Sequence, residues 1–221
     1  MAGMLDNVFI KAAVLTTIVF SLGVLVGAWL DVSRLESVKA SLEDISDSWS
    51  DARMQTLYYQ MFVKAPGFCD AAIQSNLDFN AKIYEEGVRI ERYEEVNKFT
   101  PALLSEKRRY ALLQLQFWFN SVELRESCDA NYTTLVYLYS KNDSLSIEQN
   151  LQSAVLLEAK DKCGDRLMLI PLPADIDIET IELVKSNFGI SRFPALLIDE
   201  SVVLEGLQSE LDLAKAVQCL R

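Results

Sequence analysis

The hydrophobic positions divide the chain into three parts with different periods. Residues 8–30 form an apolar run in which Lys11 is the only charged residue. Between residues 31 and 127, apolar residues recur every three or four positions, which is the period of an amphipathic helix. From about residue 131, short runs rich in β-branched and aromatic residues alternate with helical stretches. The pattern predicts an anchor at 1–30, a helical stalk at 31–127 and a mixed domain of the α+β or α/β class at 128–221.

The apolar run at residues 8–30 predicts a membrane-spanning helix. About 20 apolar residues cross a bilayer, and Trp29, a residue type that favours the membrane interface, ends the run before Asp31. A cleavable signal peptide is the alternative, but its apolar core is shorter, roughly 7–15 residues. We therefore expect a retained single-pass signal anchor. Gly23 and Gly27 lie one turn apart in it, where they either let a second helix approach closely or reflect the abundance of glycine in membrane helices.

Two breaks divide the stalk. Ala65-Pro66-Gly67 and Phe99-Thr100-Pro101 combine residues that end helices, so separate helices are predicted before the first break, at about 70–97 and at 102–126. The first of these helices carries a heptad-like apolar seam, which predicts a coiled coil or bundle and a route to a homo-oligomer. The seam consists of Leu35, Val38, Leu42, Ile45, Trp49 and Ala52, and is extended by Tyr58, Tyr59, Met61 and Phe62.

The stretch from Tyr132 onward predicts the element order β-α-β-α-β-β-α. The predicted strands are Thr133–Tyr139, Leu167–Leu172, Phe193–Asp199 and Val202–Glu205, and the predicted helices are Ile147–Lys160, Ile176–Asn187 and Gln208–Leu220. The last two strands are close enough in sequence to form a hairpin. This order predicts a mixed four-stranded sheet with helices on both faces.

A glycine-aliphatic pair and an Arg-Phe-Pro turn lead into the third predicted strand, in the sequence NFGISRFPALLID from Asn187 to Asp199. Together with the element order, this stretch resembles the thioredoxin superfamily over about residues 131–221. The whole layout resembles membrane-anchored archaeal proteins with a thioredoxin-like fold. The resemblance implies a cis peptide bond between Phe193 and Pro194, which X-Pro bonds adopt at low cost. It also implies that Arg192, Phe193 and Pro194 form a surface for a partner polypeptide.

The position of the family's active-site dithiol carries no cysteine in this chain. In active members the dithiol follows the first strand at a helix N-terminus, where the helix dipole stabilises a thiolate. Here that stretch, residues 140–149, contains no sulfur, and Asp143 and Ser146 have the spacing of the two cysteines. Because the chain has no histidine, nothing obvious activates a serine there as a nucleophile. The expected role is helix capping, through a capping box of Ser146 and Gln149 and an N-cap at Asp143 or Ser144.

Four widely spaced cysteines fit structural disulfides if the compartment is oxidising. A bond between Cys69 and Cys128 would pin the stalk to the entrance of the domain. The thioredoxin resemblance implies that the helices ending near Cys163 and Cys219 lie on the same face of the sheet and run the same way, so these two can pair. Each bond would contribute roughly 3–4 kcal/mol. Four buried free thiols are the alternative, and the sequence alone does not fix the connectivity.

The charge and the lack of histidine argue against several functions. With a net charge of −11, the chain lacks the basic character of proteins that bind nucleic acid or anionic lipid surfaces. Most zinc sites and the Ser-His-Asp and Cys-His mechanisms need histidine, so we expect no metal and no other cofactor. The cluster Lys107-Arg108-Arg109 is expected to be a solvated face opposite the acidic residues between Glu85 and Glu95.

The membrane orientation is not decided by positive charges, because Lys11 lies on one side of the apolar run and Arg34 and Lys39 on the other. Asn131 and Asn142 each begin an acceptor sequence for N-glycosylation. These two sequences and the even number of cysteines favour a cell-membrane protein whose C-terminal domain is extracytoplasmic.

The sequence predicts a protein that binds or scaffolds a partner polypeptide and is redox-inactive at the usual site. Two alternatives stay open. One is a thiol–disulfide oxidoreductase accessory that uses a cysteine outside any CxxC motif. The other is a structural subunit of a membrane complex, assembled through the glycine stripe and the heptad seam. Fold-level analogy does not identify the partner.

Overall fold

The computed structural model describes residues 10–30, 32–33, 50, 54, 57, 67–96, 101–140 and 143–221. The predicted heptad seam at 35–52, its extension at 58–62, and Asn142 lie outside these residues.

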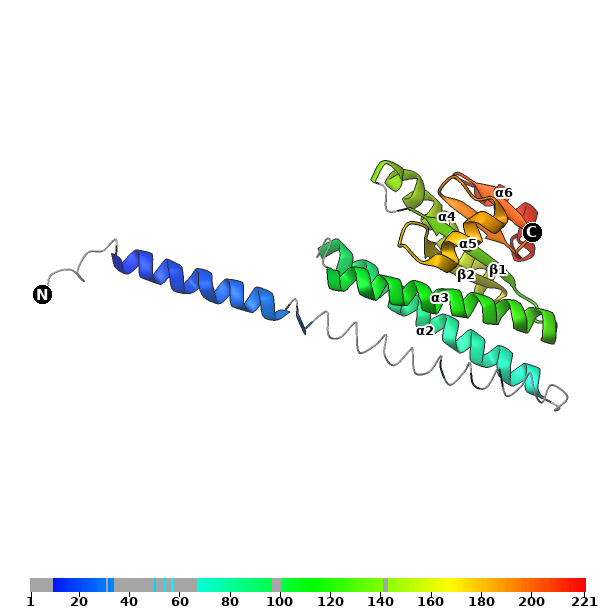
Figure 1. Cartoon of the computed structure of the whole chain (residues 1–221), viewed down its shortest axis with the longest axis horizontal. Coiled ribbons are helices and arrows are strands. Elements are labelled where there is room, and N and C mark those ends of the chain that lie inside the picture. The colour runs from blue at the N-terminus through cyan, green and yellow to red at the C-terminus, as the bar shows by residue number, and fades with distance from the viewer. Residues whose placement is uncertain are drawn as a thin grey trace, which may run out of the picture.

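The N-terminal helix runs from Ile10 to Leu30, coloured blue in Figure 1, and has a mean hydropathy of 2.2 over its most apolar stretch. At 1.5 Å per residue its 21 residues span about 31 Å, close to the thickness of a bilayer's hydrocarbon core. The Thr16 and Thr17 hydroxyls donate to the carbonyls of Ala12 and Ala13, so neither hydroxyl is left without an acceptor. The helix is long and apolar enough to cross a membrane.

Two long helices, α2 (Phe68–Val96) and α3 (Pro101–Cys128), form an antiparallel pair. Their bounds agree with the helices predicted at about 70–97 and 102–126. Proline is favoured at the first position of a helix because the N–H it lacks would have no partner there. A disulfide between Cys69 and Cys128 joins the beginning of α2 to the end of α3.

The rest of the chain contains a four-stranded mixed sheet, which confirms the predicted element order. The strands are β1 (Thr133–Tyr139), β2 (Leu167–Pro173), β3 (Ala195–Ile198) and β4 (Val202–Glu205), in the spatial order β2-β1-β3-β4. β1 pairs with β2 in parallel and with β3 antiparallel, and β3 pairs with β4 antiparallel. The helices are α4 (Ser146–Cys163), α5 (Glu179–Phe188) and α6 (Glu210–Ala216), with short 3-10 helices at Asp143–Leu145, Gly164–Arg166 and Gln218–Leu220.

Side chains of the central strands alternate between the two faces of the sheet, as a strand's period of two requires. One face packs against α4 and α6, through Leu135, Tyr137, Leu196 and Ile198 with Leu156, Ala159, Leu213 and Val217. The other face packs against α5 and against the α2–α3 pair, through Val136, Leu138, Met168 and Ile170 with Ile181, Phe79, Ile83 and Phe117. Helices therefore cover both faces, and α2 and α3 share one hydrophobic core with the sheet.

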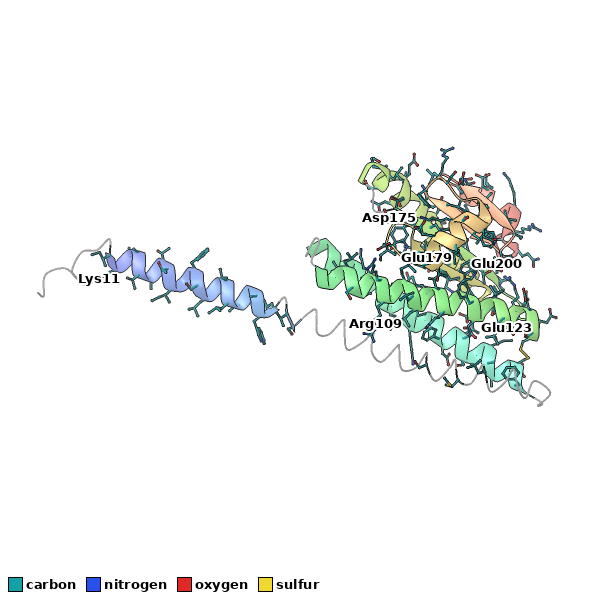
Figure 2. The ribbon with its side chains drawn as sticks, viewed as in Figure 1. Lys11, Arg109, Glu123, Asp175, Glu179 and Glu200 are labelled. Carbon is teal, nitrogen blue, oxygen red and sulfur yellow. A yellow bond between two sulfur atoms is a disulfide. The ribbon has the colours of Figure 1, made fainter. Side chains whose placement is uncertain are left out.

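Arg125 of α3 fastens the helical pair to the turn between β3 and β4 (Figure 2, where Glu200 is labelled). Its Nη1 donates to Thr134 Oγ1 at 2.9 Å and to Asp199 Oδ1 at 2.6 Å, and its Nη2 is ion-paired with Glu200. The indole N–H of Trp118, also on α3, donates to Glu200 at 2.6 Å. Charge-assisted bonds of this kind fix the orientation of α3 against the sheet.

Arg108 forms a second contact of this kind, so one residue of the Lys107-Arg108-Arg109 cluster, which was expected to be a solvated face, is bonded to the domain, although its side chain is still 41% exposed. Its guanidinium donates to the Ile176 carbonyl at 2.9 Å and to Asp177 in the segment between β2 and α5. Arg108 thus binds backbone carbonyls of the segment between β2 and α5. Since α2 and α3 pack on the sheet, the described part of the predicted stalk is not separated from the sheet, and the domain boundary near residue 128 stays a prediction.

Candidate functional site

The pairing of β1 with β3 brings two of the predicted site regions to one end of the sheet. Leu138 pairs with Ala195, so the chain leaving β1 at Ser140 lies at the end where Phe193 and Pro194 enter β3. The Phe193–Pro194 peptide bond is cis, as the resemblance implies. Pro194 is buried, Phe193 is half-buried and Arg192 is exposed, so this end of the sheet offers a mixed polar and apolar surface.

The loop that carries Arg192 is held by a carboxylate of β4. Glu205 accepts hydrogen bonds from the backbone N–H groups of Ser191 at 2.6 Å and Arg192 at 2.9 Å. These two bonds favour the ionised carboxylate and lower the pKa of Glu205. The preceding turn ends α5 at Gly189, which has the left-handed φ of 67° that glycine adopts without steric cost. The Arg192 loop is therefore fixed at both of its ends.

The stretch after β1 begins α4 in a way that corrects the predicted capping. The N-cap of α4 is Leu145, which has no side-chain oxygen, and no side chain caps it. Ser146 is exposed in the first turn, so it does not form a capping box with Gln149. Gln149 is 7% exposed and instead accepts from the backbone N–H of Ser140 at 2.5 Å. The Gln149 amide therefore ties the end of β1 to α4.

The remaining predicted site residues are placed as follows. Ser144 and Ser146 are exposed, and Asp143 opens the short 3-10 helix before α4. Asn131, the first glycosylation candidate, is exposed just before β1. Gly23 and Gly27 lie on the exposed N-terminal helix, and within the described part of the chain no atom lies within 4 Å of the position that a Cβ would take on either glycine.

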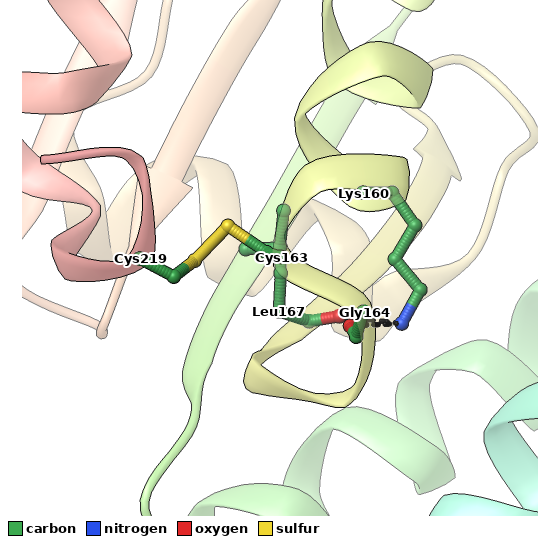
Figure 3. The surroundings of a disulfide bond; sticks show 5 residues. All are labelled: Lys160, Cys163, Gly164, Leu167 and Cys219. Carbon is green, nitrogen blue, oxygen red and sulfur yellow. Dashed lines mark hydrogen bonds between the residues drawn. A yellow bond between two sulfur atoms is a disulfide. The ribbon is translucent and has the colours of Figure 1, made fainter.

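Both predicted cysteine pairs lie at disulfide distance. Cys163 and Cys219 have Cα atoms 5.5 Å apart, on the face of the sheet that α4 and α6 share (Figure 3), and Cys69 and Cys128 have theirs 5.4 Å apart. The described residues contain no free cysteine. Next to Cys163, the Lys160 ammonium donates to the carbonyls of Gly164 and Leu167, both at 2.8 Å, and burial lowers the pKa of Lys160. None of these sulfur atoms is at the dithiol position of the thioredoxin family.

A cavity of about 370 Å³ opens next to this end of the sheet, between the α2–α3 pair, α4 and the edge strand β2. We name it the tyrosine cavity. Its walls contain four tyrosines, aliphatic and proline residues, and several amides and hydroxyls. The tyrosines are Tyr84, Tyr110, Tyr137 and Tyr139, and the polar residues include Gln114, Ser140, Ser146, Gln149, Asn150 and Ser153. Two residues of the stretch that follows β1, Ser140 and Ser146, therefore line it.

A chain of hydrogen bonds in the cavity wall fixes the orientation of the Gln114 amide. The Tyr110 hydroxyl donates its single proton to the Ile83 carbonyl at 2.9 Å, so its oxygen can only accept from Gln114, at 2.7 Å. The Gln114 NH₂ group must face Tyr110, and its Oε1 is then left without a hydrogen-bond partner among the described residues. Gln114 is 1% exposed, and an unsatisfied buried acceptor costs about 1–3 kcal/mol.

Glycine at position 87 makes this arrangement possible. A Cβ built on Gly87 would lie 2.3 Å from the Tyr110 hydroxyl oxygen, so a side chain there would displace the tyrosine from its place against α2. Burial of the neighbouring Tyr137 raises its pKa, so that its hydroxyl stays protonated and donates to the Gln149 carbonyl at 3.0 Å.

Sequence reasoning did not find the tyrosine cavity, because its walls come from α2, α3, α4, β1 and β2. One signal was present. Tyr137 and Tyr139 alternate along β1, and Tyr110 and Gln114 lie one turn apart on α3, so each pair shares a face. Nothing in the spacing shows that the two faces meet.

No protein-family model matches the chain, and no curated protein matches it in sequence. The function proposed below therefore rests on the geometry of the chain itself.

Proposed function

We propose that this chain is a membrane-anchored extracytoplasmic protein whose C-terminal domain has a thioredoxin-like fold and binds a partner polypeptide without dithiol chemistry. The observation that carries the proposal is the placement of the cysteines. All four lie in two pairs at disulfide distance, and none is in the stretch after β1 where the family places its dithiol.

The topology of the sheet supports the thioredoxin-like part. Its element order β-α-β-α-β-β-α, its parallel β1–β2 pair and the antiparallel β3 and β4 are those expected of a thioredoxin core. Pro194 directly precedes β3, and α4 directly follows the degenerate active-site stretch. These features show a similar arrangement of elements, which does not identify a function. The binding role is inferred from the surface around the end of β1, described below.

The location is supported by three features. The helix Ile10–Leu30 has the length and hydropathy of a membrane span. Disulfides persist in oxidising compartments, so two cysteine pairs fit an extracytoplasmic domain. Asn131 is exposed, as a glycosylation acceptor must be.

The surface around the end of β1 has the chemistry of a polypeptide-binding site. Arg192 is exposed beside the half-buried Phe193. On α4, Ile147 and Leu151 are 74% and 52% exposed and lie one turn apart. Large apolar side chains exposed next to polar ones mark surfaces that bind proteins.

The first test is a thiol count on the full chain, purified without reductant, alkylated and mapped by mass spectrometry. We expect complete bridges between Cys69 and Cys128 and between Cys163 and Cys219. A free cysteine that is alkylated rapidly would contradict the proposal and would favour the thiol–disulfide accessory instead.

The second test locates the binding surface. A photo-crosslinking amino acid replaces Arg192 in the full chain in its native membrane, and Leu183, which is 61% exposed on α5, serves as the control position. We expect a discrete polypeptide adduct from position 192 and none from position 183. Equal labelling from both positions, or no adduct from position 192, would contradict binding at this surface.

A further inference from the structure

The edge strand β2 pairs with the rest of the sheet on one side only, because it stands first in the strand order. Just past its end, the N–H of Ala174 donates to the Tyr139 carbonyl at 2.6 Å, which continues the ladder between β2 and β1. Backbone groups of successive strand residues point to alternate sides, so the even-numbered residues of β2 face β1. The odd-numbered residues of β2 therefore turn their backbone groups to the free edge.

Two further observations agree with this assignment. Proline has no N–H to give to a ladder, so in a sheet its nitrogen lies toward a free edge, and both prolines of β2, Pro171 and Pro173, are odd-numbered. The carbonyl of Leu167, also odd-numbered, accepts from the ammonium of Lys160, a residue of α4 and not of the sheet, at 2.8 Å. The free edge of β2 is thus defined by three independent contacts.

Part of this edge has no hydrogen-bond partner. Leu167 is satisfied, because its N–H donates to the Gly164 carbonyl and its own carbonyl accepts from Lys160. Leu169 differs from it. Among the described residues, none bonds the N–H or C=O of Leu169 from the free side, and none bonds the Pro171 carbonyl there. One donor and two acceptors are left along the edge, which is the pattern that pairs with a further extended segment.

The tyrosine cavity passes round this edge. Leu169 and Pro171 are half-buried and line the cavity. Other parts of the lining come from both faces of the sheet, since Tyr137 and Leu156 belong to the core under α4 and Ile83 belongs to the core on the opposite face. A space that reaches both faces beside β2 must run past its free edge, where the unpaired groups lie.

The cavity has the length of a short extended peptide. Its lining on β2 runs from Leu169 to Pro173, about 13 Å at 3.3 Å per residue. On α4 the lining runs from Ser146 to Leu157, about 17 Å at 1.5 Å per residue. About four residues of extended chain span the same 13 Å as the lined part of the edge.

We propose that the tyrosine cavity binds an extended segment of about four residues of the partner polypeptide, which pairs with the free edge of β2. One residue of the segment exchanges two hydrogen bonds with the N–H and C=O of Leu169, and an N–H two residues away donates to the Pro171 carbonyl. Main-chain bonds of this kind supply affinity, and the pockets beside the edge select side chains. Because Pro171 and Pro173 offer no donor, the pairing stops after a short segment.

The aromatic walls indicate which side chains the segment carries. Side chains of an extended segment alternate between the two sides of the edge. Tyr137 and Tyr139 lie on the side of α4, and Tyr84 and Ile83 of α2 lie in the other wall. Aromatic and aliphatic side chains therefore fit on both sides.

This inference rests on the proposed function, because it states how the partner polypeptide is held. It concerns a separate site, since Arg192, Phe193 and Pro194 are not among the residues that line the cavity. The adduct expected from position 192 reports on the Arg192 surface, and the experiment below reports on the edge of β2. Each can therefore fail while the other holds.

The edge donor can be removed without breaking the sheet. Leu169→Pro deletes the outward N–H, as the natural prolines of β2 do at the two following odd positions. Leu169→Ala is the matched control, because it shortens the side chain and keeps the N–H. Ile170→Pro deletes an N–H that faces β1, so its urea midpoint should fall far below that of Leu169→Pro. Equal midpoints for the two proline variants would overturn the assignment of the edge and the proposal with it.

The probe is a mixed library of acetylated tetrapeptide amides with aromatic, aliphatic and hydroxyl side chains. It is incubated with the full chain in lipid nanodiscs, and retained peptides are identified by mass spectrometry after subtraction of those retained by empty nanodiscs. Ser153→Phe places a ring inside the cavity, since Ser153 lines it from α4. Ser186→Phe makes the same substitution at an exposed position of α5 and is the matched control. Urea unfolding establishes that each variant is folded.

The best retained peptide is then synthesised with an N-methyl group at each backbone nitrogen in turn, and dissociation constants are measured by calorimetry. We expect methylation to weaken binding at least about three-fold at alternate positions and to have little effect between them, because only alternate N–H groups of a paired segment face β2. This scan uses the wild-type chain, so it decides the matter even where a proline variant fails to fold.

We expect wild type and Ser186→Phe to retain the same peptides and Ser153→Phe to lose them. Leu169→Pro should bind the best peptide at least about three-fold more weakly than Leu169→Ala, the effect of one lost hydrogen bond. The proposal is overturned if wild type retains no peptide, if folded Ser153→Phe retains the same peptides, if the methylation scan shows no alternation, or if folded Leu169→Pro binds as Leu169→Ala does. An adduct from position 192 together with any of these results would overturn this inference alone.

Discussion

Replacing Arg125 tests whether α3 is fastened to the β3–β4 turn as the contacts indicate. Its side chain is 22% exposed and that of Glu200 is 21% exposed, so this pair is partly desolvated, while Asp199 is 38% exposed. Arg125→Met keeps the aliphatic stem but leaves two carboxylates without their cation. Removing one partner of a fully buried pair costs roughly 3–5 kcal/mol and a surface pair roughly 0–1 kcal/mol. For this intermediate burial we expect a loss of about 2–3 kcal/mol.

A double-mutant cycle isolates the interaction between the two side chains. Glu200→Gln retains an oxygen that can accept from Trp118 but turns an amide N–H toward Arg125, and should cost about 1–2 kcal/mol. The double variant should lose less than the sum of the single losses, by a coupling energy of about 1–2 kcal/mol. The exposed pair of Lys215 and Asp212 on α6 is the control, where Lys215→Met should cost less than about 1 kcal/mol.

The assay is urea unfolding of the full chain in detergent, followed by tryptophan fluorescence, because the buried Trp118 is itself bonded to Glu200. The free energy of unfolding is extrapolated to water for each variant. A coupling energy below about 0.5 kcal/mol, or an Arg125→Met loss no larger than that of Lys215→Met, would refute the conclusion that this cluster fastens α3 to the sheet.

Three further predictions follow from single features of the core. Replacing Cys163 and Cys219 together by alanine opens a loop with a sequence separation of 56, so the free energy of unfolding should fall by about 4 kcal/mol; an unchanged thermal midpoint would show that no bond was present. Burial raises the pKa of Tyr132 to about 12, so its contribution to stability is complete below pH 10 and is lost as the pH rises through 12. In urea titrations at each pH, wild type should lose about 2–3 kcal/mol more than Tyr132→Phe over this range, and equal losses would contradict the prediction. Gly87→Ala should displace Tyr110 and cost about 1–2 kcal/mol in urea, despite alanine's higher helix propensity; a stabilised variant would show that the tyrosine is not held there.

The strands and the disulfide pairs could be predicted from sequence because their signals are local or depend on topology alone. β1 matches its predicted bounds, since Thr133 to Tyr139 is an unbroken run of β-branched, aromatic and aliphatic residues between polar segments. The thioredoxin resemblance implied that α4 and α6 cover one face, as they do in the structure. The pairing of Cys163 with Cys219 then follows from where these elements end.

The packing of α3 on the sheet was missed although α3 carried a signal for it. Leu113, Leu115 and Phe117 alternate with Gln114 and Gln116, so their side chains point to different sides of the helix, and all three are buried. A helix that is apolar on more than one side is buried on more than one side. α3 packs against α2 on one side and against β1 and β2 on another, which a two-helix stalk cannot provide.

The start of α4 was predicted incorrectly for a different reason. Ser146 and Gln149 have the spacing of a capping box. The side-chain oxygen of Gln149 instead accepts from the backbone N–H of Ser140, the residue that follows β1, where the strand pairing has ended. A tertiary contact with a partly buried backbone donor prevailed over a local pattern, because the orphan N–H groups of an exposed helix end can bond to water instead.

The same contact helps to form the tyrosine cavity at the end of β1. Gln149 holds Ser140 against α4, and β2, with Pro171 and Pro173, runs along the edge of the sheet, where the missing N–H groups also discourage pairing with another strand. α3 lies beside β2 and is fixed by Arg108 at one point and Arg125 at another. The space between α4 and the α2–α3 pair is therefore lined by fixed elements. A pocket whose walls are already in place loses little conformational entropy when a molecule enters it, and this favours binding there.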